Sequence, residues 1–298
     1  MSYLDDSTPL NSITIPGTHN SHALKGTICA LQGSDIGDQL AEKAADIYGT
    51  IGSLFTGVGL QGVGLMQDIG EKTGACQDRA IAWQLIAGVR CIDLRIGDGW
   101  TLRHGRVGLP GIIFTACAGI RDFLKANPSE TVLLQAKWDL ESFLTSNRKP
   151  EPPNFGRDLR DVLKNIFGDY IDLKEQESPT LGQARGKVVL CNERSQFKGR
   201  GLAKEASSNL KAIWDKYGIQ GVLLAPDSAL VNTPEMFAGR EIPQFMQELE
   251  PLVREGKKVN LGIVDMDFPV VSGLCTPAEE PLSETAVILW GLILLNFP

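Results

Sequence analysis

Two periods of hydrophobic residues alternate along the chain and predict strands and helices in turn. Short apolar runs rich in β-branched residues are typical of buried parallel strands, and apolar residues three or four positions apart are typical of amphipathic helices. Strands are predicted at residues 13–15, 89–95, 130–137, 187–191, 221–224 and 259–267. Helices are predicted at residues 80–87, 114–126, 155–167, 206–217 and 234–255. This alternation predicts an α/β fold whose parallel strands are joined by right-handed crossovers.

The predicted strand at 89–95 carries charged residues among apolar ones. Ile92 and Leu94 alternate with Asp93 and Arg95. Because successive side chains of a strand point to opposite faces, the two charged side chains share one face. Functional groups of α/β barrels gather at the carboxyl ends of the strands. The polar face of this strand therefore indicates a site.

Two histidines also lie near predicted strand ends. His19 follows the strand at 13–15, which Pro16 and Gly17 are expected to end, so that His19 is presented on a loop. His104 lies in a short segment after the charged strand. A histidine has an unperturbed pKa of about 6.5, and it can therefore act as acid or base at neutral pH.

These side chains suit the cleavage of a phosphodiester by a neighbouring hydroxyl group. That reaction needs a base for the hydroxyl, an acid for the leaving alkoxide and positive charge on the phosphoryl oxygens. Two histidines can supply both proton transfers, and Arg95 can hold phosphate oxygens through two parallel hydrogen bonds. The set needs no metal ion.

Four motifs resemble the X region of phosphatidylinositol-specific phospholipase C, and most closely its metal-independent bacterial and fungal members. They are Pro-Gly-Thr-His-Asn at 16–20, Gly-Val-Arg-Cys-Ile-Asp-Leu-Arg at 88–95, Arg-His-Gly at 103–105 and Val-Asp-Met-Asp-Phe-Pro at 264–269. The resemblance runs from about residue 11 to 269. It implies a distorted TIM-type (β/α) barrel, with residues 1–298 as a single domain and an inserted helix and Gly-rich loop at about 23–78.

The resemblance also implies a role for each catalytic residue. His19 would be the general base, His104 the general acid and Arg95 the phosphate clamp. Asp267, which matches the aspartate of the family's Asp-Phe-Pro motif, would orient His19. Asp93 would support Arg95 or His104 from the same strand face.

Three further residues are candidates for binding substrate. Lys137 and Arg185 resemble the positions of the family that face the polyol at strand ends, although a charged residue that closes a strand is also an ordinary solvated end. Asn20 stands where the bacterial enzymes have an aspartate that assists the acid histidine. A neutral amide cannot raise the pKa of His104 in that way, so we expect acid catalysis to be altered.

Neither a metal nor another cofactor is expected. The calcium-dependent eukaryotic enzymes have asparagine at the position of Asn20, but they have an acidic residue at the position of Arg95, where a cation would repel Ca²⁺. One amide and Asp93 are a poor site for an ion that takes about 6 to 8 oxygen ligands. His22 lies outside the motif, and a structural or rim role is expected for it.

Composition limits the partners. The chain has 298 residues, 43% of them hydrophobic and 22% charged, and a formal net charge of −7. This charge argues against nucleic acid and against electrostatic docking on an anionic bilayer, so any membrane contact would be transient, apolar and local. The longest apolar run, 286–295, is shorter than the roughly 18 residues of a spanning helix and predicts a buried last helix. Residues 1–6 carry no secretory signal pattern, and the sequence leaves the compartment open between secreted and cytoplasmic.

The six cysteines have no spacing typical of a metal site. Cys91 and Cys191 fall in predicted strands and are interpreted as small core hydrophobes. Cys29 and Cys76 bracket the inserted segment, and they are the best candidates for a disulfide if the protein is secreted.

The inserted segment contains a Gly-x-Gly-x-x-Gly match at 57–62, which follows no clear strand and is interpreted as chance. Its apolar residues at 52–70 suit either a loop packed over the barrel or a lid or rim that shapes the site or touches lipid.

Three functions remain open at this stage. The first is a phosphoric diester lyase or hydrolase of lipid metabolism that cleaves phosphatidylinositol or a related polyol phosphodiester through a cyclic phosphate. The second is a different proton-transfer reaction of the two histidines on a small metabolite without phosphate. The third is a catalytically silent lipid-binding module, although binding alone does not require an acid and base pair.

Overall fold

The computed structural model describes about half of the chain. It covers residues 1–26, 74–105, 107–139, 150–173, 179–191, 260–266 and 291–297, the backbone of 222–224, and positions 247, 250, 251, 253–256 and 289. The predicted helix at 206–217, most of the helix at 234–255 and most of the inserted segment lie outside the described residues.

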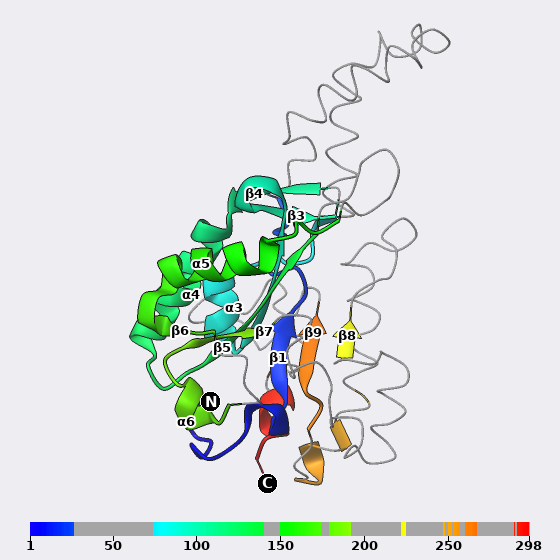
Figure 1. Ribbon diagram of the computed structural model, residues 1–298. Coiled ribbons are helices and arrows are strands. Elements are labelled where there is room, and N and C mark those ends of the chain that lie inside the picture. Colours follow the sequence, from blue (N-terminus) through cyan, green and yellow to red (C-terminus); the bar gives the residue numbers. More distant parts are fainter. Residues whose placement is uncertain are drawn as a thin grey trace, which may run out of the picture.

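A curved parallel sheet forms the centre of the molecule (Figure 1). Its strands lie in the order β6-β7-β5-β2-β1-β9-β8. They are β1 (Ile15–Thr18), β2 (Cys91–Ile96), β5 (Val132–Trp138), β6 (Ile171–Asp172), β7 (Val188–Cys191), β8 (Val222–Leu224) and β9 (Ile263–Met266). Every pairing along this path is parallel, which confirms the predicted α/β class.

An antiparallel hairpin extends the sheet beyond the carboxyl end of β2. It consists of β3 (Thr101–His104) and β4 (Val107–Ile112), and Ile96 of β2 pairs with Leu102 of β3. The hairpin rises at the top of Figure 1, while both termini lie at the opposite end of the sheet. The hydrophobic pattern did not predict this hairpin, because hydrophobic and polar residues alternate over only short runs in its two strands.

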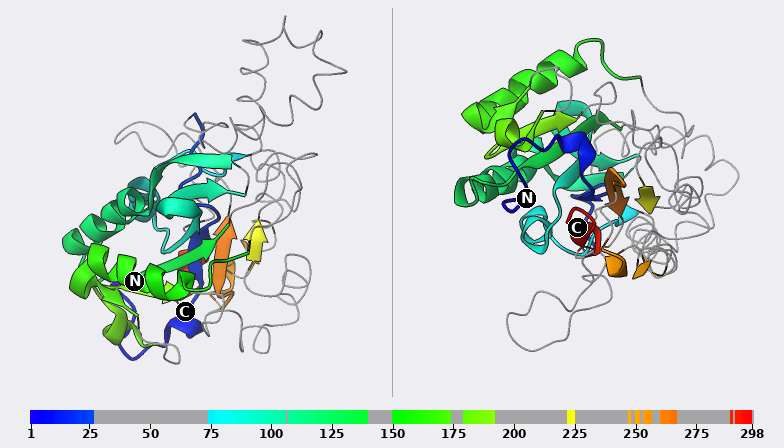
Figure 2. Two further views of the ribbon diagram at one scale, coloured as in Figure 1. Left: turned by 45° about the horizontal axis from the view of Figure 1, so that its top comes forward. Right: turned by 90° about the horizontal axis from the view of Figure 1, so that it is seen from below.

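Helices α3 (Ile81–Ala87), α4 (Ile113–Ala126) and α5 (Phe155–Phe167) lie together on the outer face of the sheet (Figures 1 and 2). The short helix α6 (Leu181–Ala184) lies near the N-terminus, and three 3₁₀ turns occupy Leu10–Ser12, Asp98–Trp100 and Gly168–Tyr170. Helix α5 buries residues at spacings of three and four, which is the period of a helix with one apolar face. Gly88 ends α3 in the left-handed region, at φ 113°, where glycine avoids strain.

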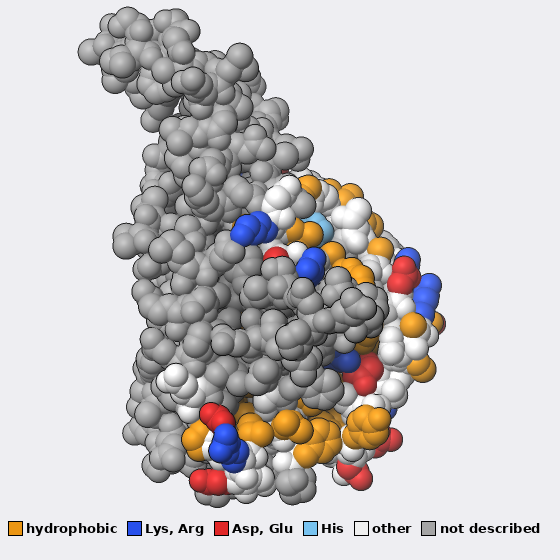
Figure 3. Space-filling model, turned by 180° about the vertical axis from the view of Figure 1, so that it is seen from behind, with side chains coloured by type: hydrophobic (Ala, Val, Ile, Leu, Met, Phe, Trp, Pro, Cys, Tyr) orange, Lys and Arg blue, Asp and Glu red, His pale blue; other side chains and the backbone are white. Residues whose placement is uncertain are grey.

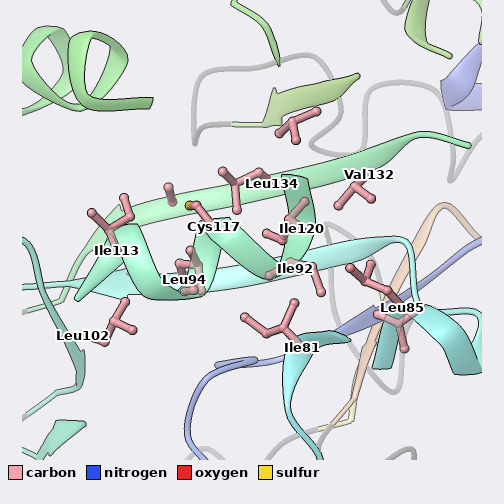
Figure 4. Close-up of a cluster of buried hydrophobic side chains, with 14 of the residues drawn as sticks. Ile81, Leu85, Ile92, Leu94, Leu102, Ile113, Cys117, Ile120, Val132 and Leu134 are labelled. Carbon is pink, nitrogen blue, oxygen red and sulfur yellow. The ribbon is translucent and has the colours of Figure 1, made fainter. Parts of the chain in front are cut away.

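The two faces of the sheet form two separate clusters of buried side chains. Outward residues of β2 and β5, such as Ile92, Leu94 and Leu134, pack against Leu85 of α3 and Ile120 of α4 (Figure 4). Inward residues form the floor of the barrel. Each fully buried Leu, Ile or Val side chain among them contributes about 1.5 to 3 kcal/mol to the free energy of folding. The floor comprises Leu10, Ile13, Ile15, Cys91, Leu133, Leu181, Ala184, Val189, Cys191 and Ile263.

Cys91 and Cys191 belong to this floor, as predicted, and burial raises the pKa of both thiols. The partner proposed for Cys76, Cys29, lies outside the described residues.

One strand boundary was predicted wrongly. Pro16 and Gly17 do not end the first strand but lie inside β1. Proline lacks only its N–H, and the carbonyl oxygen of Pro16 still accepts a hydrogen bond from the Arg90 N–H at 2.8 Å. The strand therefore continues to Thr18 and delivers His19 immediately after its carboxyl end.

Candidate active site

His19 is fixed between the first and the last strand of the sheet. Its backbone N–H donates to the carbonyl oxygen of Met266 at 3.0 Å. The side-chain amide of Gln77 donates to the carbonyl oxygens of His19, at 2.8 Å, and Met266, at 3.1 Å. Gln77 is buried, so its amide holds the loop after β1 against β9. No local sequence pattern predicts this contact, because Gln77 is far from either strand along the chain.

His104, the last residue of β3, meets His19 above the sheet. The two imidazole rings have centroids 5.7 Å apart and planes at 82°. The Nδ1 atom of His104 lies 2.9 Å from the carbonyl oxygen of Gly74 and 3.6 Å from the Cys76 Sγ. A carbonyl oxygen only accepts hydrogen bonds, so the Nδ1 of His104 carries a proton.

Asp93 and Arg95 form a buried ion pair on the inner face of β2. The Arg95 Nε donates to the Asp93 Oδ2 at 2.7 Å, and the Lys137 Nζ lies 3.9 Å from the Asp93 Oδ1. Burial opposes ionisation of Asp93, but the charges of Arg95 and Lys137 outweigh it and hold the pKa of Asp93 well below its usual value. Burial likewise opposes the Arg95 cation, while Asp93 and Asp139 raise its pKa. Both groups are therefore charged at every physiological pH.

The register of the sheet explains this grouping. Arg95 pairs with Lys137 and Asp93 pairs with Gln135 across β2 and β5. Paired residues of neighbouring strands point to the same face. The predicted polar face of β2 is thus continued by β5, toward the carboxyl ends of both strands.

Asn20 is buried next to the ion pair in the left-handed region, at φ 44°. Asparagine tolerates this conformation better than most residues. Its backbone N–H donates to the Asp93 Oδ2 at 3.0 Å, and the next backbone N–H, of Ser21, donates to the Asp93 carbonyl oxygen at 2.9 Å. The loop that carries His19 is therefore tied to β2 through Asp93.

The resemblance seen in the motifs agrees with comparisons to known proteins. The sequence model described as "Phosphatidylinositol-specific phospholipase C, X domain" matches residues 69–194, a range that includes Asp93, Arg95 and His104. The 1-phosphatidylinositol phosphodiesterase of Listeria monocytogenes is 27% identical over 305 residues, which cover 90% of this chain and 80% of that protein. The chain is therefore similar in sequence to phosphatidylinositol-specific phospholipase C, and the similarity includes three of the predicted catalytic residues.

Solved structures of the family share the fold. The phospholipase C of L. monocytogenes matches with a TM-score of 0.62 and 22% identity over 99% of this chain and 97% of that chain. A Staphylococcus aureus phosphatidylinositol-specific phospholipase C matches with a TM-score of 0.61 and 18% identity over 99% of this chain and 96% of that chain. The sheet described above is accordingly that of a distorted TIM-type barrel.

The structure does not bring Arg185 to the candidate site beside His19 and His104, and its predicted position was wrong. Arg185 follows α6 and precedes β7, so it lies at the amino ends of the strands. Its guanidinium binds the carboxylate of Asp6 and the carbonyl oxygens of Leu4, at 2.7 Å, and Ser129, at 2.6 Å. The pattern misled because Arg185 directly precedes the predicted strand at 187–191, and the short helix before that strand was not expected.

His22 packs under the hairpin rather than beside the other two histidines. Its Nε2 lies 2.9 Å from the carbonyl oxygen of Pro110. Burial lowers the pKa of His22, and the hydrogen bond to Pro110 only partly opposes this. We interpret the His22 side chain as a neutral ring that holds β4 against the loop after β1.

Two buried aspartates of the site were missed by sequence reasoning. Asp139, directly after β5, accepts hydrogen bonds from the Arg95 Nη1 at 3.3 Å and from the Gly105 N–H at 3.1 Å through the same oxygen. Asp265 of β9 points inward and accepts from the Gln135 amide at 3.2 Å. Burial raises the pKa of Asp265 to about 6, and the charge of Asp93 adds to the effect. Asp267, the predicted partner of His19, lies outside the described residues.

Within the described part of the chain, no three His, Cys, Asp or Glu side chains are grouped so that they could hold a metal ion. Arg95 and Lys137 place positive charge at the candidate site. No described helix is both long and apolar enough to cross a bilayer.

Proposed function

We propose that the protein is a phospholipase C-like phosphodiesterase that cleaves phosphatidylinositol or a related polyol phosphodiester. The observation that carries this proposal is the pair of imidazoles 5.7 Å apart beside the buried Asp93 and Arg95 pair, at the carboxyl ends of parallel strands. The family and the named activity of the Listeria relative support the substrate class.

The first step forms a cyclic phosphate. His19 takes the proton from a hydroxyl group of the polyol, and that oxygen attacks the neighbouring phosphorus. The bond from phosphorus to the alcohol oxygen breaks, and His104 donates a proton from its Nε2 to the leaving oxygen. The products are a cyclic phosphodiester and a free alcohol, and water can open the ring afterwards with the two histidines in exchanged roles.

Arg95 stabilises the charge on the phosphoryl oxygens in this proposal. Its guanidinium is oriented by Asp93 and by Asp139, and these two contacts use only part of its five N–H donors. A preoriented cation in a buried site needs little reorganisation during the reaction. In this proposal Lys137, which is 31% exposed near the end of β5, contacts the polyol. Asp267 remains the predicted partner that orients His19.

The mechanism needs no metal ion. Arg95 provides the positive charge that calcium provides in the calcium-dependent members. We therefore expect EDTA to leave the rate unchanged, and strong inhibition by EDTA would contradict the metal-free mechanism.

Substitution of the two site histidines tests the catalytic roles. We expect His19→Ala and His104→Ala each to lower the rate on phosphatidylinositol by about 10² to 10⁴, because each removes a proton transfer. His22→Gln is the matched control, since His22 contacts Pro110 and not the site; its rate should stay near that of the wild type. Full activity of His19→Ala would contradict the proposal. If the wild type cleaves no inositol or glycerol phosphodiester, the lipid-binding or non-phosphate alternatives apply.

Contact with a membrane surface would be apolar under this proposal. Ile112 and Phe114, at the junction of β4 and α4, are 39% and 43% exposed. The described part of the face in Figure 3 mixes hydrophobic, basic and acidic side chains without a broad basic patch. Binding to vesicles of neutral lipid should therefore depend little on salt, and a steep loss of binding between 50 and 200 mM salt would contradict this.

A further inference from the structure

The Asp139 side chain bridges Arg95 on β2 and the turn that follows β3. The residue follows β5 and is 3% exposed. One oxygen, Oδ2, accepts from the Arg95 Nη1 and from the backbone N–H of Gly105, the residue after His104. Its own backbone N–H donates to the carbonyl oxygen of Ile96 at 2.9 Å, so Asp139 is itself fixed against β2.

We propose that Asp139 is a positioning residue that sets the place of the acid histidine relative to the phosphate clamp. This inference rests on the proposed function of the site. The carboxylate acts through Arg95 on one side and through the turn at Gly105 on the other.

The contact with Arg95 fixes the plane of its guanidinium. Asp93 within β2 binds the Nε, and Asp139 directly after β5 binds the Nη1, so two acceptors from two different segments hold one planar group. A planar fork held at two points has little freedom to rotate. The remaining N–H donors then point in a constant direction.

The contact with Gly105 fixes the backbone beside the acid. Gly105 has φ 56°, in the left-handed region, and it turns the chain from β3 to β4. The ring of His104 is held separately through its Nδ1 and the carbonyl oxygen of Gly74. The backbone after His104 and its ring are thus anchored at two places, and the Asp139 carboxylate links the backbone anchor directly to the Arg95 guanidinium.

Two substitutions separate the two contacts. Asp139→Asn keeps an oxygen that can accept from the Gly105 N–H but removes the charge that faces Arg95. Asp139→Ala removes both contacts. Asp98→Asn is the control, because Asp98 is an exposed acidic residue on the neighbouring 3₁₀ turn.

Two substrates report on the two contacts. A substrate with an alkyl alcohol as leaving group needs the acid, whereas one with an activated phenol does not. We expect Asp139→Asn to lower kcat about 10-fold on both substrates through Arg95. Asp139→Ala should show the same loss on the phenol substrate and a further loss of about 10-fold on the alkyl substrate alone. His104→Ala defines the effect of losing the acid completely.

Amide hydrogen exchange checks the contact without any substrate. The Gly105 amide should exchange faster in Asp139→Ala than in the wild type and stay protected in Asp139→Asn. The proposal would be overturned if the Gly105 amide exchanged at an unchanged rate in Asp139→Ala. It would also be overturned if both variants lost the same kcat on both substrates and their Tm fell to match. A wild type that cleaves neither substrate would instead refute the proposed function, while the exchange measurement would still decide the contact.

Discussion

Asn20 is the residue at which this chain departs from the bacterial members that its motifs resemble. Asn20→Asp should place a negative charge near the site and raise the pKa of His104. A larger fraction of His104 would then carry the acid proton, so the rate on substrates with alkyl leaving groups should rise by about a few-fold. This gain is smaller than the roughly 10² to 10⁴ that a whole general acid contributes. The rate on substrates with phenol leaving groups should change little. Rates of the variant on both substrate types decide the matter. An equal change on both would mean that Asn20 positions the substrate instead.

Asp265 is a second carboxylate in the interior and predicts a pH dependence of stability. Its pKa is raised to about 6 from an ordinary value of 3.8, so the folded state binds this proton more tightly than the unfolded state. The stabilisation of the folded state by this bound proton is complete below pH 3.8 and is lost as the pH rises through 6. It amounts to a free energy of unfolding on the order of 2 to 3 kcal/mol.

Asp265→Asn should remove this dependence. The stability of the variant relative to the wild type should rise between pH 4 and pH 7, which urea unfolding at several pH values can measure. A stability difference that is constant over this range would contradict the shift of the Asp265 pKa.

Some residues of the candidate site could be predicted from the sequence and others could not, for physical reasons. His19, Asp93, Arg95 and His104 could be found because their motifs lie within or next to strands. Asp139 was missed because its partners, Arg95 and Gly105, are 44 and 34 residues away along the chain, and no local pattern records such contacts.

At the scale of elements, β5 was predicted well because a strand buried on both faces has a long apolar run. Strand β2 was predicted well because its apolar and charged residues alternate. The hairpin of β3 and β4 was missed because its strands are short and follow a polar turn. Helix α5 was predicted within its observed limits because one apolar stripe packs on the sheet.

Strand β1 makes a close contact that depends on Gly17. A Cβ atom at this position would collide with the carboxylate of Asp265 and come within 3.1 Å of the Cys91 Cβ. We expect Gly17→Ala to lower the free energy of unfolding by about 1 to 3 kcal/mol, the usual range for overpacking, and to lower activity because His19 lies two residues further on. Chemical unfolding of the variant tests this. Gly119→Ala is the control, because a Cβ there meets nothing within 4 Å.

At the scale of the whole molecule, the two ends of the barrel serve different purposes. The N-terminal segment crosses the amino ends of the strands, where Leu10 and Ile13 join the inner cluster. Arg185 holds this segment from α6. The site lies at the opposite end of the strands, so contacts at the amino end should affect stability and leave the chemistry alone.

Arg185→Ala tests this division. Loss of its hydrogen bonds to Asp6, Leu4 and Ser129 should lower the free energy of unfolding by about 1.5 to 3 kcal/mol, the range for hydrogen bonds to charged groups. The KM and kcat should not change. Lys137→Ala should in contrast raise the KM. A higher KM in Arg185→Ala would contradict this division between the two ends.

The alternation along β2 also bears on how the chain reaches its fold. A strand paired one residue out of step would turn Asp93 and Arg95 toward the outer helices and move Ile92 and Leu94 into the polar interior. An uncompensated charge among apolar side chains costs several kcal/mol, so wrongly paired arrangements of this strand are poorly populated. The charges that serve the site therefore also select the correct alignment while the chain folds.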